Sequence, residues 1–195
     1  MRKHSKFMTS MLAVAMGGIL SAAAWAGATF KVDSVHSNAS FRIKHMNVSY
    51  AYGRFNDIAG TFTLDGDNSS IDVSVQAKSV DTKNEMRDNH LRGPDFFNVK
   101  QFPEITFKST KAKVDGDKIE FTGDLTLHGV TKSITVVLTK TGEGEGMAPP
   151  GQPKPYLAGL EGTLTIKRSD YGMDKMVGPV ADEVTLTIAF DGARQ

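Results

Sequence analysis

Beyond the first thirty residues, apolar and polar side chains alternate with a period of two through nearly the whole chain. Such alternation predicts strands with one buried and one solvated face. About eight such strands, with no long helical pattern between them, favour an all-β fold, either a closed antiparallel barrel or a sandwich. Because a barrel of roughly eight strands can enclose one small ligand, a container is our first functional hypothesis and a catalyst our second.

The turn residues indicate where the strands are joined. Gly66–Asn68 and Asp115–Asp117 each stand between two alternating runs, which predicts a hairpin at both places. Residues 142–155 are rich in Gly and Pro without apolar periodicity and are expected to form a loop. Strands are expected where the alternation is clearest, at 39–45, 58–64, 71–77, 105–107, 119–127, 134–138, 158–166 and 184–190.

The N-terminus has the pattern of a cleavable secretory signal peptide. A basic start is followed by the apolar run Met8–Leu20 and by Ala24–Ala26, which fits the small-residue cleavage pattern. Residues 1–26 are therefore interpreted as a signal peptide, and residues 27–195 as a single domain in the periplasm. The apolar run falls short of the ~20 residues that a membrane span needs, so we expect no stable membrane anchor.

The composition of the exported part excludes several function classes. Cleavage removes three of the 23 basic residues and none of the 22 acidic ones, which leaves 20 against 22 and a net charge of −2. This balance gives no electrostatic footprint for nucleic acid. The chain has no cysteine, so its stability depends on its core rather than on disulfides. Whether it is a monomer or a dimer is left open; an exposed strand edge and the 142–155 loop are the two places that could support a dimer.

No motif in the chain argues for catalysis or for a metal. His36, His45, His90 and His128 occur in no zinc-binding spacing, and neither a nucleophile elbow nor a phosphate-binding loop is present. We therefore expect no catalytic residue, no metal and no cofactor other than a bound lipid.

Two polar segments interrupt the strand pattern. Residues 81–98 are expected to form a short helical lid over one end of the barrel, capped by Asp81 or Thr82 with Glu85 reaching back. Arg87 and Arg92 would then be available to a polar headgroup, although pairing of Arg87 and Asp88 with neighbouring loops is the more ordinary alternative. Residues 168–172 end a strand and are expected to place a buried Arg–Asp network against this lid.

Four blocks of sequence together resemble the YceI-like family of exported, lipocalin-like barrel proteins. They are Asp33–Ser37 followed by Phe41 and His45, Ser79–Phe107, Gly123–Lys132 and Arg168–Gly172, in this order along the chain. The resemblance implies an eight-stranded antiparallel barrel with a long apolar tunnel, in which some members bind polyisoprenoids or related amphiphiles. It implies no catalytic residue, because the family has none agreed.

The leading hypothesis is a periplasmic protein that sequesters or carries a long-chain isoprenoid lipid of quinone or polyprenyl type. Two alternatives stay open: a non-catalytic, stress-related interaction module with a packed barrel, and an enzyme acting on such a lipid through His45 or His128. The candidate ligand-binding residues are Phe41, Ile43, His45, Phe62, Arg87, His90, Phe96, Phe97, Leu125, Leu164 and Ile188.

Overall fold

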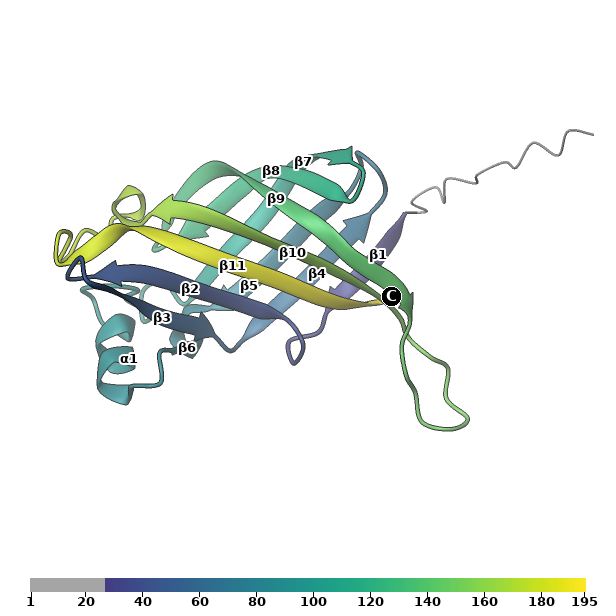
Figure 1. Ribbon diagram of the computed structural model, residues 1–195, viewed down its shortest axis with the longest axis horizontal. Coiled ribbons are helices and arrows are strands. Elements are labelled where there is room, and N and C mark those ends of the chain that lie inside the picture. The colour runs from purple at the N-terminus through teal and green to yellow at the C-terminus, as the bar shows by residue number, and fades with distance from the viewer. Residues whose placement is uncertain (1–26) are drawn as a thin grey trace, which may run out of the picture.

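The computed structural model describes residues 27–195 as one continuous, strongly curved sheet with a single α-helix at one end (Figure 1). The predicted signal peptide, residues 1–26, lies outside the described residues. The helix is α1 (Glu85–Arg92), and 3₁₀ turns occupy Ala77–Ser79 and Arg168–Tyr171. The strands are β1 (Ala28–Val32), β2 (Asn38–His45), β3 (Ser49–Phe55), β4 (Ile58–Leu64), β5 (Ser70–Gln76), β6 (Val80–Asp81), β7 (Glu104–Asp115), β8 (Lys118–Leu127), β9 (Val130–Glu145), β10 (Tyr156–Lys167) and β11 (Val180–Arg194).

Eight of these strands form a closed antiparallel ring. The order is β1-β4-β5-β7-β8-β9-β10-β11, and β11 returns to β1 with Phe30 opposite Arg194. The first half of β11 pairs instead with β2, from which β3 and β6 continue as a branch. The predicted eight-stranded antiparallel barrel is thus confirmed, although β2, which the alternation counted in the ring, belongs to the branch.

Three strands, β1, β3 and the two-residue β6, were not predicted, and β7, β9 and β11 extend beyond their expected ranges. β1 and β3 fell outside the expected ranges, because β1 is only five residues long and β3 exposes Tyr50 and Tyr52 on its outer face. The predicted loop 142–155 begins later than expected, because β9 continues to Glu145. Gly142 lies opposite Gly159 there, next to a bulge, and a glycine-rich strand without apolar alternation looks like a loop in the sequence.

Gly123 marks a bulge in the barrel wall. It lies opposite Ser109, where the register between β7 and β8 shifts by one residue. A β-carbon at this position would collide with the carbonyl oxygen of Lys108, so only glycine allows the two backbones to approach this closely. Gly123 is thus explained by a close backbone approach at a bulge.

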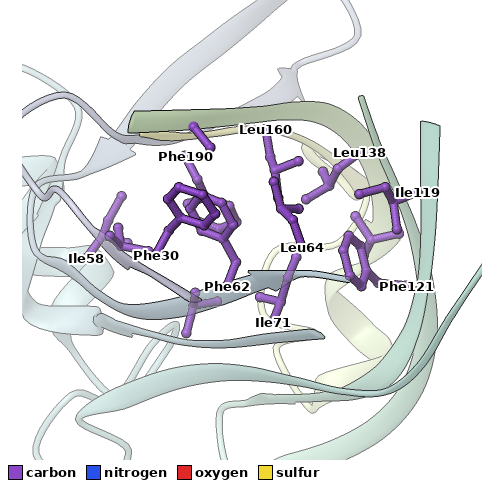
Figure 2. Close-up of a cluster of buried hydrophobic side chains, with 14 of the residues drawn as sticks. Phe30, Ile58, Phe62, Leu64, Ile71, Ile119, Phe121, Leu138, Leu160 and Phe190 are labelled. Atoms are coloured by element: carbon purple, nitrogen blue, oxygen red, sulfur yellow. The ribbon is translucent and has the colours of Figure 1, made fainter. Parts of the chain in front are cut away.

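Large buried side chains fill the end of the barrel where β1, β4 and the C-terminus lie, which we call the packed end (Figure 2). The rings of Phe30 and Phe62 are stacked with their centroids 5.2 Å apart, and Phe190 lies 6.5 Å from Phe62. Leu160 on β10 is 1% exposed and belongs to the same cluster. The opposite end carries α1, the β2–β3 turn and the loop 172–179, and we call it the lid end (Figure 1).

Candidate functional site: an apolar cavity under the lid

A cavity of about 210 Å³ occupies the barrel interior between the packed cluster and α1. Its walls are apolar apart from Ser40, Thr106 and Arg168. Alternation aims every second side chain inward, so β2, β8, β10 and β11 each contribute a row of aliphatic or aromatic groups. Seven of the predicted ligand-binding residues lie in these walls or in the lid segment: Phe41, Ile43, Phe96, Phe97, Leu125, Leu164 and Ile188.

Further lining residues were missed by the sequence analysis. Val184 and Leu186 share an inward face with Ile188, so the alternation already contained the signal that would have found them. Met173 and Val180 also line the cavity, but they flank a loop in which no periodicity points inward or outward.

Three phenylalanines connect the wall to the lid. Phe41 contacts Phe55 with ring centroids 5.8 Å apart, and Phe55 meets Phe97 edge-on at 5.4 Å. The Phe41 ring lies over Gly53, its cross-strand partner, where any β-carbon would collide with the ring. Glycine at position 53 therefore leaves the space that the Phe41 ring occupies.

The lid helix is held to the branch by polar contacts. Asn84, not Asp81 or Thr82, is its N-cap, and its Oδ1 accepts from the Arg87 N–H at 3.0 Å. Thr82 is instead bound by the buried Asp88, whose Oδ1 accepts its N–H at 2.9 Å. The predicted capping box is therefore wrong, because the Thr82 hydroxyl is already taken up by Asp88 and Glu85 is the first helical residue.

Arg87 and His90, the two predicted ligand-binding residues on α1, are exposed and do not line the cavity. Arg87 donates through Nε to the Thr82 hydroxyl at 2.6 Å and through Nη2 to the Thr82 carbonyl at 2.7 Å. His90 is 3.3 Å from an Asp95 carboxylate oxygen and edge-on to Phe96. These local contacts agree with the structural alternative, in which Arg87 and Asp88 fasten the lid segment. Leu91 is the α1 side chain that reaches the cavity.

Phe62 and His45 also lie away from the cavity. Phe62 is 1% exposed within the packed end, because β4 carries it to the part of the barrel that other rings already fill. His45 is the exposed last residue of β2, paired with Ser49 and Val180. Their predicted place in the cavity is corrected on these grounds.

Arg168 is a charged residue in the cavity lining, and it is only 3% exposed. Its guanidinium donates to four backbone carbonyls, those of Met173, Lys175, Val180 and Ala181, at 2.6–3.0 Å. Burial lowers the pKa of Arg168, whereas the nearby carboxylates of Asp182 and Asp174 raise it.

The predicted Arg–Asp network between residues 168–172 and the lid is not formed. Backbone carbonyls take up the Arg168 donors, Asp182 accepts from Ser169, and Asp88 binds Thr82. Arg168 instead clamps the loop 172–179 against the end of the barrel.

His128, the second histidine considered for catalysis, lies outside the cavity lining, against the Phe102 ring and the 3₁₀ turn that ends at Tyr171. Its Nδ1 lies 3.1 Å from the Tyr171 carbonyl oxygen, so this nitrogen carries the proton. Its Nε2 is buried and has no hydrogen-bonding partner among residues 27–195. In the same part of the chain, no cluster of His, Asp or Glu is arranged to hold a metal ion, and no helix is long and apolar enough to cross a membrane.

A closed antiparallel barrel with an apolar cavity under a short helical lid defines a lipocalin-like β-barrel protein. The family model of the YceI-like domain matches residues 30–191. A UPF0312 protein of Pseudomonas aeruginosa is 43% identical over 192 residues, covering 95% of this chain and 98% of that protein. The chain therefore belongs to the YceI-like family.

Solved structures share the fold. BcnA of Burkholderia cenocepacia superposes with a TM-score of 0.72 at 27% identity, covering 82% of this chain and 98% of BcnA. A polyisoprenoid binding domain from Saccharophagus degradans, described as implicated in plant cell wall breakdown, has a TM-score of 0.65 at 15% identity. This match covers 85% of our chain and 98% of that domain, and at 15% identity it shows a shared fold alone.

Proposed function

We propose that this chain is a periplasmic binding protein that sequesters or carries a long-chain isoprenoid lipid of quinone or polyprenyl type. The observation that carries the proposal is the cavity itself, whose walls offer aliphatic and aromatic groups and three polar residues. Removing an alkyl chain from water is worth about 0.8 kcal/mol for each buried CH₂ group, before the cost of ordering the chain. The proposal includes export after cleavage of residues 1–26, one domain over 27–195 and no resident cofactor.

The charge in the cavity narrows the class of lipid. Arg168 brings a positive charge to a wall in which no carboxylate takes part. In such an apolar environment a positive charge is screened weakly and would repel an ammonium group. We therefore propose that the lipid has a neutral or anionic head, as polyprenols, quinones and polyprenyl phosphates do.

The two alternatives are less well supported. A packed interaction module needs a filled barrel, whereas the lid end of this barrel encloses a cavity. An enzyme needs an acid or base beside the ligand head, and neither His45 nor His128 is among the lining residues. Binding without chemistry is accordingly the function that the geometry supports best.

The first test is native mass spectrometry of the protein purified from its own periplasm, with solvent extraction and identification of the bound lipid. We expect one isoprenoid chain per protein. In Leu164→Trp the indole would occupy the cavity and reduce this occupancy at least about tenfold. Thr165→Trp is the matched control, because Thr165 is the next residue on β10 and faces outward. An empty wild-type protein, under conditions that keep a known lipid carrier loaded, would contradict the proposal and favour the interaction module.

A further inference from the structure

Two neighbouring turns at the lid end expose large apolar side chains. Met46 and Val48 in the β2–β3 turn are 55% and 84% exposed, and Met176 and Val177 in the loop 172–179 are 44% and 45% exposed. The turns lie side by side, because the Met46 N–H donates to the Pro179 carbonyl at 2.6 Å. We call these four side chains the apolar tip.

The apolar tip continues directly from the cavity wall. Met173 lines the cavity at one end of the loop that carries Met176 and Val177, and Val180 lines it at the other. Arg168 holds this loop through the carbonyls of Met173, Lys175 and Val180. A surface that contacted the tip would therefore lie within a few residues of the cavity wall.

The β2–β3 turn is not explained by the needs of the hairpin. Met46 and Asn47 have φ angles of 51° and 57°, and the Val48 N–H closes the turn on the His45 carbonyl. Such turns favour Asn and Gly, since a β-carbon is strained in the left-handed region. Placing Met46 there has an energetic cost, and because its side chain is exposed, packing within the protein does not offset this cost. The position is therefore a candidate for contact with a partner.

The β2–β3 hairpin, whose turn carries Met46 and Val48, has basic and aromatic side chains. Residues 38–55 contain Arg42, Lys44 and Arg54 and no acidic residue, in a chain whose overall charges nearly balance. The Arg42 guanidinium lies 4.9 Å from the centre of the Tyr50 ring, which is 49% exposed. Apolar tips backed by basic and aromatic side chains match a bilayer interface, where tyrosine lies at headgroup level and Lys and Arg pair with phosphate.

We propose that the lid end docks on an anionic phospholipid bilayer, with the apolar tip inserted among the acyl chains and Arg42 and Lys44 against the phosphates. This inference rests on the proposed function, since it gives the lipid a route between a membrane and the cavity. It does not require the protein to remain on the bilayer, because four side chains on two turns give weak, reversible binding.

The test is co-sedimentation of residues 27–195 with vesicles of phosphatidylcholine that contain about one third phosphatidylglycerol. We expect the triple variant Met46→Ser, Val48→Ser, Val177→Ser to lower the partition coefficient at least about tenfold. We expect Lys44→Gln to lower it about fivefold, and only when the anionic lipid is present. The control is Met147→Ser, because Met147 is 97% exposed on the loop between β9 and β10 at the other end of the barrel (Figure 1).

A second measurement separates this proposal from the proposed function. Displacement of the fluorescent probe N-phenyl-1-naphthylamine by geranylgeraniol, without vesicles, reports on the cavity alone and is expected to be the same in wild type and triple variant. Wild-type protein that displaces the probe but does not sediment with vesicles would overturn the docking proposal only. Sedimentation that is unchanged in the triple variant would overturn it as well. Failure of displacement in the wild type would contradict the lipid-binding function itself.

Discussion

Leu160 and Leu164 lie four residues apart on β10 and face the same interior, yet their surroundings differ. Leu160 is 1% exposed among the side chains of the packed end, whereas Leu164 is half-buried and borders the cavity. At the packed end, Phe30, Phe62 and Phe190 meet across the interior. At the lid end β11 pairs with β2 instead of β1, and the rings of Phe41, Phe55 and Phe97 run from the wall to the lid.

The difference teaches that stability and binding are divided along the barrel axis. The packed end resembles an ordinary close-packed core, in which each inward methyl group contributes to folding. The lid end leaves inward apolar groups without opposing neighbours, so the same type of residue contributes to an occupant's binding instead. A substitution should therefore change either the free energy of unfolding or the ligand affinity, according to its position along the axis.

The largest expected effect is on stability at the packed end. Leu160→Ala should lower the free energy of unfolding by about 3 kcal/mol, because it leaves a cavity among close-packed side chains. Leu164→Ala should lower it by only about 1 kcal/mol, since part of its surface already borders empty space, but should weaken geranylgeraniol binding about threefold. Urea unfolding and probe displacement measure the two quantities. Equal losses of stability at both positions would contradict the division.

Adding volume should have the opposite asymmetry. Ala158→Leu at the packed end overfills a close-packed region and should cost about 2 kcal/mol of stability. Ala39 belongs to the same buried cluster but also lines the cavity, so in Ala39→Leu the same extra carbons can extend into the cavity, where they should cost less than about 1 kcal/mol and reduce ligand occupancy. Thermal unfolding with and without geranylgeraniol makes the comparison. If the ligand raised the Tm of Ala39→Leu as much as that of the wild type, the cavity would not be its binding site.

A smaller effect is expected at the lid. Asn84→Ala removes the side-chain cap of α1 and should destabilise this helix by about 1 kcal/mol, leaving the barrel intact. Hydrogen exchange of the amides of residues 85–92 should become about fivefold faster, while exchange in β8 stays unchanged. Met86→Ala on the same helix is the control, since Met86 is 85% exposed. Unchanged exchange in Asn84→Ala would show that tertiary contacts, not the cap, hold the lid.

The smallest effect concerns acid. The Ser169 N–H, assisted by the Ser169 hydroxyl and the charges of Arg168 and Lys167, lowers the pKa of the Asp182 carboxyl below its ordinary value of 3.8. A lowered folded-state pKa gives stability that is present above pH 3.8 and is lost as the pH falls through the lowered value. Asp182→Asn should therefore flatten the acid limb of the Tm profile slightly. An acid limb as steep as that of the wild type would remove Asp182 from this role.

How much could be predicted from the sequence depended on what each pattern encodes. The alternation identified the inward face of β2, β8, β10 and β11, and so placed Phe41, Leu125, Leu164 and Ile188 correctly in the walls. It could not tell Phe62 from these residues, because alternation decides between inside and outside but not how far along the axis a residue lies. That position is set by the stagger between neighbouring strands.

Short polar segments were harder to interpret. Arg87 and His90 carry the charge and the ring expected of ligand contacts. In the structure, however, Arg87 binds Thr82 and His90 lies against Asp95, each partner being five residues away along the chain. Arg168 was assigned an aspartate partner, whereas backbone carbonyls of the loop that follows satisfy it. A sequence lists the donors in such a segment but does not show which nearby acceptor is geometrically within reach.

The pairing of β1 with β11 has a consequence for the order of folding. Phe30 lies opposite Arg194, so the seam that closes the ring joins the two ends of the described chain. Contacts between residues so distant in sequence form slowly, because a long loop must be closed before they add stability. The ring therefore closes only when residues 192–194 are in place, because these residues are the partners of β1 on β11. Without this seam the sheet would keep two free edges, and the interior that holds the cavity would not be enclosed.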